Sequence, residues 1–234
     1  MEKTYRYEIH LHTSETSPCG RVPGARCAAL HAAAGYDAVC VTDHYFRAIA
    51  ERLPGRDPAS RAHAWLSGFR AVREEGSRLG LTVLPAMELR FDDSWNDYLV
   101  YGITEELLAC HPALYAMDWT RFRAFADEHG LFVAQAHPYR DGCRPTDPRR
   151  LDGIETWNGN PRHDSRNASA EALADLHPHL VRLAGSDFHQ ECDLAGASMR
   201  LPGLAQDSAE LVRLLRAGGT ADIGPCGGGV SAQA

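Results

Sequence analysis

The 234-residue sequence has no CxxC pair, no long apolar run and no cluster of lysines and arginines. Its seven cysteines are odd in number and scattered, which argues against a disulfide framework and favours a reducing cytoplasm. The first ten residues lack the apolar core of a signal peptide, and no later run could cross a bilayer, so we expect no membrane association. With a formal net charge of -7 and no basic run, the chain is not expected to bind long nucleic acid.

The length suits one domain of barrel size. We expect a single domain over residues 1–224, followed by a glycine-containing flexible tail over 225–234. A hydrophobic content of 44% is that of an ordinary globular protein, so this domain can bury a large core. A self-contained domain of this kind is expected to be a monomer.

Short apolar runs rich in β-branched residues alternate with longer segments of helical character. Seven strands are predicted, at 5–9, 38–42, 82–86, 98–103, 131–135, 153–156 and 180–184, with a weaker one near 221–223. The helical segments include one over 57–80, with Asp57 as its N-cap, and one over 118–130, with Asp118 as its N-cap. This alternation indicates βα units and a mostly parallel sheet, and seven units without a domain break favour a closed barrel.

Imidazoles and carboxylates follow the predicted strands. His10 and His12 lie one residue apart in a strand-like segment, so their side chains point the same way. The other residues of this kind are Asp43 and His44, Glu88, Asp97 at the front of strand four, His137, Glu155 and Asn158, and Asp187 and His189. Because the functional residues of such barrels lie at the carboxyl ends of the strands, these side chains are expected at one rim.

The coincidence of these residues indicates metal binding, although any one of them alone would usually be an ordinary polar residue. Mixed nitrogen and oxygen ligands suit Zn, Mn or Fe. Seven or more ligands exceed what one ion takes, so two or three divalent ions are expected, with Glu88 bridging. The remaining histidines fall mostly in helices or loops, and of these only His111 and His163 stay open as further site residues.

The motifs HLHT, VTDH, AMEL, AHP and GSDFH occur in this order over residues 10–189, and together they resemble the PHP (polymerase and histidinol phosphatase) family. The resemblance implies an α/β fold, a distorted (β/α)7 TIM-like barrel, with a trinuclear metal site that hydrolyses phosphoesters. Seven of the family's nine ligand positions are matched here, by His10, His12, His44, Glu88, His137, Asp187 and His189.

The other two ligand positions depart from the family pattern. Cys19 stands where the family has Asp or His before a glycine, and Asp97 stands where it has His before an apolar run. A cysteine thiolate binds zinc well, whereas a carboxylate favours harder ions such as Mn. At the first position the alternative is a buried Cys19 thiol, with Glu15 as the ligand.

The resemblance implies a phosphoesterase in which a metal-bridging hydroxide attacks phosphorus. We expect Glu88, His44 and His189 to serve the reaction. Arginines that follow strands or the first motif are candidates for binding the substrate phosphate: Arg140, Arg162 and Arg21. By elimination, the substrate is a small phosphomonoester, such as a nucleotide or a sugar or amino-alcohol phosphate, and its specificity elements are expected within 47–79 and 139–150.

Two other hypotheses compete with a phosphoesterase. One is a metal-binding barrel without catalysis, with a structural or regulatory role, against which the near-complete ligand set argues. The other is a metal-dependent amidohydrolase on a related barrel, but the succession of AMEL and AHP fits the PHP pattern better.

Overall fold

The computed structural model describes residues 3–194 and 196–223, and the tail expected over 225–234 lies outside the described residues. Ten strands form one sheet: β1 (Tyr5–Leu11), β2 (Ala38–Val41), β3 (His44–Tyr45), β4 (Thr82–Arg90), β5 (Asp97–Tyr101), β6 (Phe132–Gln135), β7 (Gly153–Asn158), β8 (Val181–Gly185), β9 (Ser198–Leu201) and β10 (Thr220–Asp222). Their order is β10-β9-β1-β2-β4-β5-β6-β7-β8, and β3 pairs with β4 beside β2.

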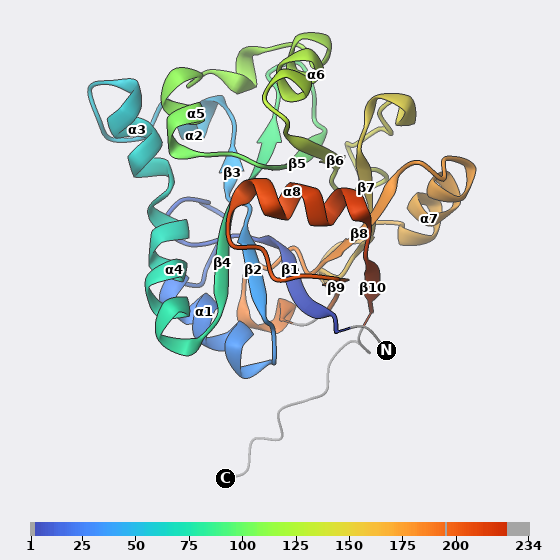
Figure 1. Ribbon diagram of the computed structural model, residues 1–234. Helices are drawn as coiled ribbons and strands as arrows, with labels where there is room; N and C mark the ends of the chain where they lie inside the picture. The colour runs from blue at the N-terminus through green and yellow to red at the C-terminus, as the bar shows by residue number, and fades with distance from the viewer. Residues whose placement is uncertain (1–2, 195, 224–234) are drawn as a thin grey trace.

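The sheet curls into a nearly closed barrel (Figure 1). It closes where the chain beyond β8 meets the end of β1: Leu11 forms a parallel bridge with Phe188, and the Phe188 amide donates to the His10 carbonyl at 3.0 Å. At the other end of β1, β9 pairs with it in antiparallel fashion, so the ring is distorted there. The expected distorted TIM-like barrel is confirmed.

Two strands, β5 and β9, depart from the mostly parallel arrangement that was expected. β5 runs antiparallel to both β4 and β6, whereas a mostly parallel arrangement was expected at this point. Only residues 91–96 connect β4 to β5, which is too short for a crossover helix, so the chain turns back on itself. The start of β5 therefore lies at the same rim as the end of β4, and Asp97 pairs directly with Arg90 across the two strands.

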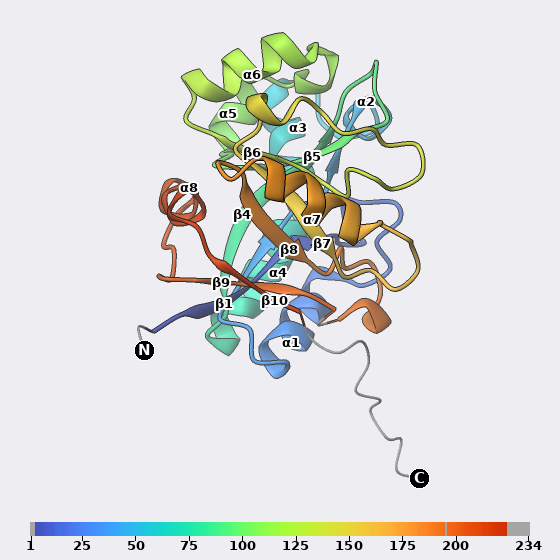
Figure 2. The ribbon, with the colours of Figure 1, turned by 90° about the vertical axis from the view of Figure 1, so that its right-hand side faces the viewer.

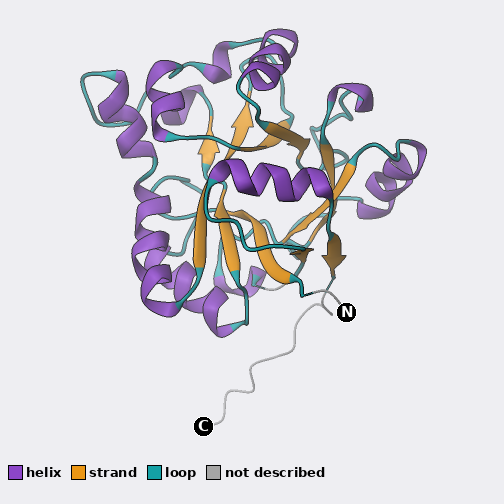
Figure 3. Cartoon of the chain, in the orientation of Figure 1, coloured by secondary structure: helices purple, strands orange, loops and turns teal. Residues whose placement is uncertain are grey.

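Helices surround the barrel (Figure 3). They are α1 (Gly24–Ala33), α2 (Arg47–Ala50), α3 (Pro58–Trp65), α4 (Ser67–Leu79), α5 (Glu105–Cys110), α6 (Trp119–Glu128), α7 (Asn167–Leu176) and α8 (Ser208–Ala217), with 3-10 turns η1 (Leu114–Ala116), η2 (Pro148–Arg150) and η3 (Glu191–Asp193). The expected caps are confirmed, because Asp57 accepts from the Ser60 amide and Asp118 from the Arg121 amide. None of the described helices is long and apolar enough to cross a membrane.

The single helix expected over 57–80 is two helices, α3 and α4, which meet at Leu66. The break lets Gly68 press against the loop after β1. A Cβ at Gly68 would stand 1.9 Å from the Thr13 hydroxyl and 2.6 Å from the Asp43 carboxylate, so only glycine permits this approach.

The buried side chains form two clusters. One packs the helices α1, α3, α4 and α6 against the sheet, and the other joins the strands to α8. α8 lies across the barrel in Figures 1 and 2, and its Arg216 donates to the Leu131 carbonyl just before β6. This contact is at the amino end of β6, so α8 covers the rim opposite the one where the predicted ligands gather.

Candidate metal centre

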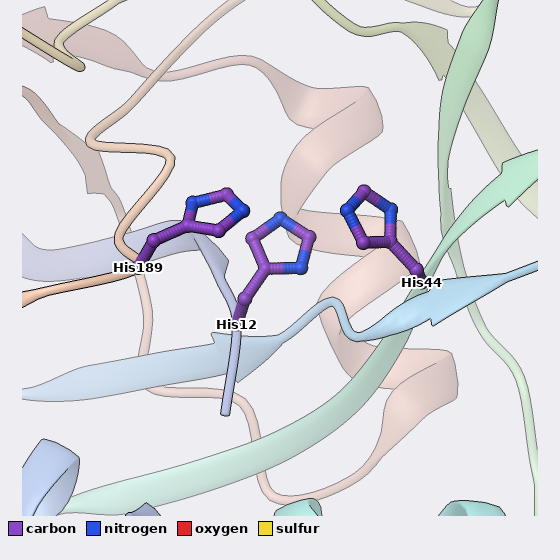
Figure 4. A group of neighbouring side chains, drawn as sticks. All are labelled: His12, His44 and His189. Carbon is purple, nitrogen blue, oxygen red and sulfur yellow. The ribbon is translucent and has the colours of Figure 1, made fainter. Parts of the chain in front are cut away.

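The seven residues matched to family ligands meet at one rim of the barrel. They come from β1 and its end, β3, β4, and the turns after β6 and β8. Their ligand atoms form overlapping groups within 4.8 Å: His12, His44 and His189; His10, Glu88 and His137; and His10, His12 and Asp187. Figure 4 shows the first of these groups, with three imidazoles from three segments of the chain turned toward one another.

Glu88 lies at the centre of the cluster. Its Oε1 is 3.0 Å from the Nε2 of His137 and 3.4 Å from the Nε2 of His10. Its Oε2 is 2.8 Å from the Nδ1 of His44 and 3.2 Å from the Nε2 of His12. A carboxylate with two imidazoles at each oxygen has the position expected of a ligand that bridges two ions.

The cluster contains buried polar atoms that no described residue satisfies. The Nε2 atoms of His10 and His12, the Nδ1 of His44 and the Oε2 of Glu88 are all buried. Although these nitrogens lie 2.8 to 3.4 Å from the carboxylate of Glu88, none of the four atoms makes a hydrogen bond of good geometry in the described part of the chain. Buried polar groups are normally paired, so four convergent exceptions mark a place for another species. Nitrogen and oxygen lone pairs in this arrangement fit divalent transition-metal ions.

The electrostatics of the cluster agree with that fit. Burial acts to raise the pKa of Glu88, but the imidazoles of His44 and His10 hold that pKa well below its usual range. Burial acts to lower the pKa of His10, but the carboxylates of Asp187, Glu155 and Glu88 outweigh burial and raise that pKa well above its usual value. Protons on the imidazoles thus balance the buried carboxylates, and metal ions would replace those protons.

Two of the clustered residues have strained backbones. His137 has φ 26° and Asp187 has φ 51°, both in the left-handed region that non-glycine residues rarely adopt. Each stands directly after a barrel strand, where this conformation turns the chain and aims the side chain into the cluster. Strain of this kind persists where surrounding structure imposes it, which is common at functional sites.

A second layer of polar residues orients the ligands. Glu155 accepts from the Nδ1 of His10 at 2.8 Å, from the His137 amide at 2.9 Å and from the Asn158 side chain at 3.0 Å. Glu155 and Asn158 are expected at this rim from the sequence, but this role is not, because it depends on contacts from distant strands. Metal-bound histidines usually donate their second ring nitrogen in this way.

Asp43 is also at the rim, but it does not face the cluster. It is buried and accepts from the amide and hydroxyl of Thr13 and from the hydroxyl of Ser17, at 2.6 to 2.8 Å. These hydrogen bonds fix the loop that follows His12. The role of Asp43 is therefore to stabilise this loop and not to serve as a metal ligand.

Cys19 stands at the mouth of the cluster, exposed to solvent, and lines a cavity of about 330 Å³ above it. Burial acts to raise the pKa of its thiol, but hydrogen bonds from His189 and His44 outweigh it and lower the pKa to about 5. The alternative ligand Glu15 is engaged elsewhere, because both of its oxygens accept from the Gly24 amide at the start of α1. Cys19 is therefore the residue of the two that faces the site.

Asp97 reaches the same cavity, but its carboxylate is already paired. Both oxygens accept from the Arg90 guanidinium at 2.8 Å, while its Oδ2 is 3.9 Å from the Nε2 of His137. Cys143, which sequence analysis did not select, lies near, with its sulfur 3.9 Å from the Nδ1 of His137. It falls in an irregular loop where no pattern marks a ligand.

The three candidate phosphate-binding arginines lie in different surroundings. Arg140 lines the cavity, and its Nη2 donates to Asp187, Asn158 and Ser165 at 2.8 to 3.0 Å. Arg162 instead forms a two-bond ion pair with Asp193 below the rim, and Arg21 is exposed. Neither lines this cavity, and the ion pair that engages Arg162 joins residues 31 positions apart, which the sequence pattern does not encode. His163, left open from the sequence, does line it.

No family model matches the sequence, and no curated protein matches it. Solved structures share its fold at low sequence identity. PsfC from Pseudomonas syringae PB-5123 has a TM-score of 0.63 at 20% identity, over 91% of this chain and 88% of PsfC. A two-domain protein from Bacteroides vulgatus, containing a predicted PHP-like metal-dependent phosphoesterase, has a TM-score of 0.66 at 17% identity, over 95% of this chain and 65% of that protein.

The lesion-specific endonuclease PfuEndoQ from Pyrococcus furiosus has a TM-score of 0.60 at 13% identity, over 94% of this chain and 58% of the endonuclease. This chain thus spans less than two thirds of the Bacteroides protein and of PfuEndoQ. The chain has the barrel of PHP-like proteins, and the resemblance stated from the motifs is confirmed at the level of the fold.

Proposed function

We propose that the protein is a metal-dependent phosphoesterase that hydrolyses a small phosphomonoester. The observation that carries the proposal is the set of four unsatisfied atoms around Glu88, which matches the donors that two or three Zn, Mn or Fe ions need. The phosphoesterase described within the Bacteroides protein supports the same reaction class for this fold. When bound, the metal ions would activate water and stabilise charge on the phosphoryl oxygens.

Other functions of the site, which are to position the ions and to orient their ligands, belong to residues of the chain. Glu88, with the imidazoles on both sides of it, holds the ions close to one another. Glu155 fixes the ring of His10 through its Nδ1, so the Nε2 stays turned into the cluster. This arrangement prepares the ligands before substrate arrives, which limits the reorganisation needed during the reaction.

Arg140 is the best-placed residue for the substrate phosphate. Its ion pair with Asp187 anchors one guanidinium nitrogen beside the cluster, and its Nε is buried without a hydrogen-bond partner among the described residues. A phosphoryl oxygen would satisfy that donor, and the planar fork of arginine suits such oxygens.

The cavity above the cluster has a volume of about 330 Å³, which is in the ordinary range of small-molecule sites, and Asp141 is part of its lining. An acidic side chain there is unfavourable for a long nucleic acid. A monomer in the cytoplasm remains our proposal, and the six described cysteines, all free, support a reducing compartment.

The test combines metal analysis with an assay on p-nitrophenyl phosphate, before and after chelation and with Mn or Zn restored. We expect two or three equivalents of metal and phosphate release that chelation abolishes. Glu88→Gln should remove turnover and leave the protein folded. The matched control is Glu191→Gln on the surface, where the carboxylate only pairs with Arg26, and it should keep full activity.

Bound metal without hydrolysis of any phosphoester would instead favour the non-catalytic, regulatory barrel. Full activity in the Glu88→Gln variant would remove Glu88 from the mechanism.

A further inference from the structure

A second cavity adjoins the one above the metal centre. It has a volume of about 510 Å³ and lies between the start of α2 and the loop over 91–96. Arg90 and Trp95 line both cavities, so the two lie side by side with these residues between them. None of the predicted metal ligands lines the second cavity, so it has no role in holding the ions. A substrate whose phosphate lies at the metal centre could extend its other end into this cavity.

Trp95 is unusual among the apolar side chains of the protein. Its indole is 73% exposed, although burial of so large an aromatic surface would be favourable. Its backbone is nevertheless held in place, because the next residue, Asn96, exchanges hydrogen bonds of 2.8 Å with the amide and carbonyl of Arg144. An exposed aromatic face on an anchored loop, beside a candidate metal centre, suits stacking with a ligand.

A second aromatic ring and a cation complete this surface. The Arg90 guanidinium lies 5.5 Å from the ring centre of Phe46 and 5.8 Å from that of Trp95. The ion pair with Asp97 holds Arg90 in this position. Two aromatic faces and a fixed guanidinium plane can contact a flat ring by stacking and by cation–π interaction.

The charge of the second cavity argues against a second phosphate. Its lining has the guanidiniums of Arg47 and Arg90 and the carboxylates of Glu51, Asp92 and Asp93. Arg47 is also engaged, since it donates to both Asp92 and Glu51. The paired cations and the excess carboxylate leave no net positive field, so the cavity suits an uncharged group and repels a polyphosphate or a continuing nucleic-acid strand.

We propose that this second cavity binds an aromatic ring in the leaving alcohol of the substrate, stacked on the exposed indole of Trp95, with Arg90 and Phe46 beside it. The inference rests on the proposed phosphoesterase function and narrows its substrate class to phosphomonoesters of ring-bearing alcohols. A nucleoside and an aryl alcohol share this chemistry, and the test below separates them. The expected 47–79 specificity segment contributes here through Arg47 and Glu51.

The test measures binding of non-hydrolysable phosphonates to the Mn-loaded protein by calorimetry. The ligands are methylphosphonate, benzylphosphonate and the phosphonate analogue of a nucleoside 5'-monophosphate. We expect an aromatic ligand to bind about tenfold more tightly than methylphosphonate. Trp95→Ala should remove that preference and leave the affinity for methylphosphonate unchanged, whereas Trp95→Phe should keep part of it. Leu176→Ala, an equally exposed apolar residue at the end of α7, is the matched control and should change nothing.

The outcomes separate this inference from the proposed function. If all three phosphonates bind equally well in the wild-type protein, the aromatic subsite is refuted while the phosphoesterase stands. If none binds to the metal-loaded protein, the proposed function itself fails. A preference that persists in Trp95→Ala would also refute the subsite. Tighter binding of the nucleoside analogue than of benzylphosphonate would identify a nucleotide, and the reverse an aryl phosphate.

Discussion

The Nδ1 of His10 lies 2.8 Å from the Oε1 of Glu155, and both side chains are completely buried. The two residues are 145 positions apart, on β1 and β7, and the barrel alone brings them together. When a metal ion replaces the Nε2 proton, this contact keeps the remaining proton on Nδ1, so the Nε2 lone pair points into the cluster beside Glu88 and Asp187. Glu155 thus acts on the metal centre without facing the cavity.

Glu155→Ala is expected to weaken metal binding by about 10- to 100-fold, because His10 and the His137 amide lose their acceptor. Competition with a chelating dye measures the affinity, and circular dichroism checks that the fold remains. Glu171→Ala, which removes an exposed pairing with Arg182, is the control. An unchanged metal affinity in Glu155→Ala would show that the contact has no part in ligation.

The stability of the metal-free protein is expected to fall as the pH rises above neutrality. Burial acts to lower the pKa of His137, but the contacts with Cys143 and Glu88 outweigh burial and raise the pKa to about 10. Burial likewise acts to lower the pKa of His44, but Glu88 and Cys19 outweigh it and raise that pKa. A raised pKa contributes stability that is full below the unfolded value of about 6.5 and is lost as the pH rises through the folded value. Thermal melts in chelator between pH 6.5 and 10 test this.

Metal should reverse that trend, because binding requires neutral imidazoles and releases their protons. We therefore expect metal affinity to increase with pH over the same range, and the metal-loaded protein to lose little stability. A metal-free protein whose melting temperature is constant from pH 6.5 to 10 would contradict the charge balance inferred for the cluster.

Among the six cysteines in the described residues, Cys19 is expected to be the most reactive thiol of the metal-free protein. Its pKa of about 5 makes it a thiolate at neutral pH, and it is exposed. Cys192 is an internal control, since it is equally accessible but burial and the adjacent Asp193 raise its pKa. Alkylation followed by mass spectrometry should label Cys19 first at pH 6.5, and Cys19→Ser should abolish this fast phase.

Alkylation in the presence of zinc tests whether Cys19 is a metal ligand. If the thiolate binds an ion, zinc should protect Cys19 from alkylation and leave the rate at Cys192 unchanged. Equal labelling with and without zinc would exclude Cys19 from the ligand set.

The sequence allowed the barrel and the rim to be predicted because both depend on local patterns. Strand periodicity and the order of the motifs locate His10, Glu88 and Asp187 without knowledge of contacts. The direction of β5 was missed since it depends on the length of one connection. The partners of Arg162 and Asp97 were missed because the choice of an ion-pair partner depends on side-chain geometry in three dimensions. The spacing of residues along the sequence does not predict that geometry.

Asp97 and Asp187 are a matched pair that tests how far the family resemblance extends. Both are buried carboxylates in contact with arginine, but Asp187 lies closer to the imidazoles. Its Oδ1 is 3.3 Å from the Nε2 of His10, whereas the Oδ2 of Asp97 is 3.9 Å from the Nε2 of His137. Asp187→Asn should therefore lose at least one equivalent of metal. Asp97→Asn should keep the metal content and lower the melting temperature by roughly 5 °C, because Arg90 is left without its anion.

Elemental analysis of the two variants beside the wild type distinguishes the roles. Loss of metal in Asp97→Asn would mean that Arg90 releases the carboxylate when ions bind, and that Asp97 fills the family's ligand position after all. Retention would mean that the Arg90 ion pair has replaced a ligand at this position. In that case Asp97 serves the second cavity instead, because it holds in place the guanidinium that contacts Phe46 and Trp95.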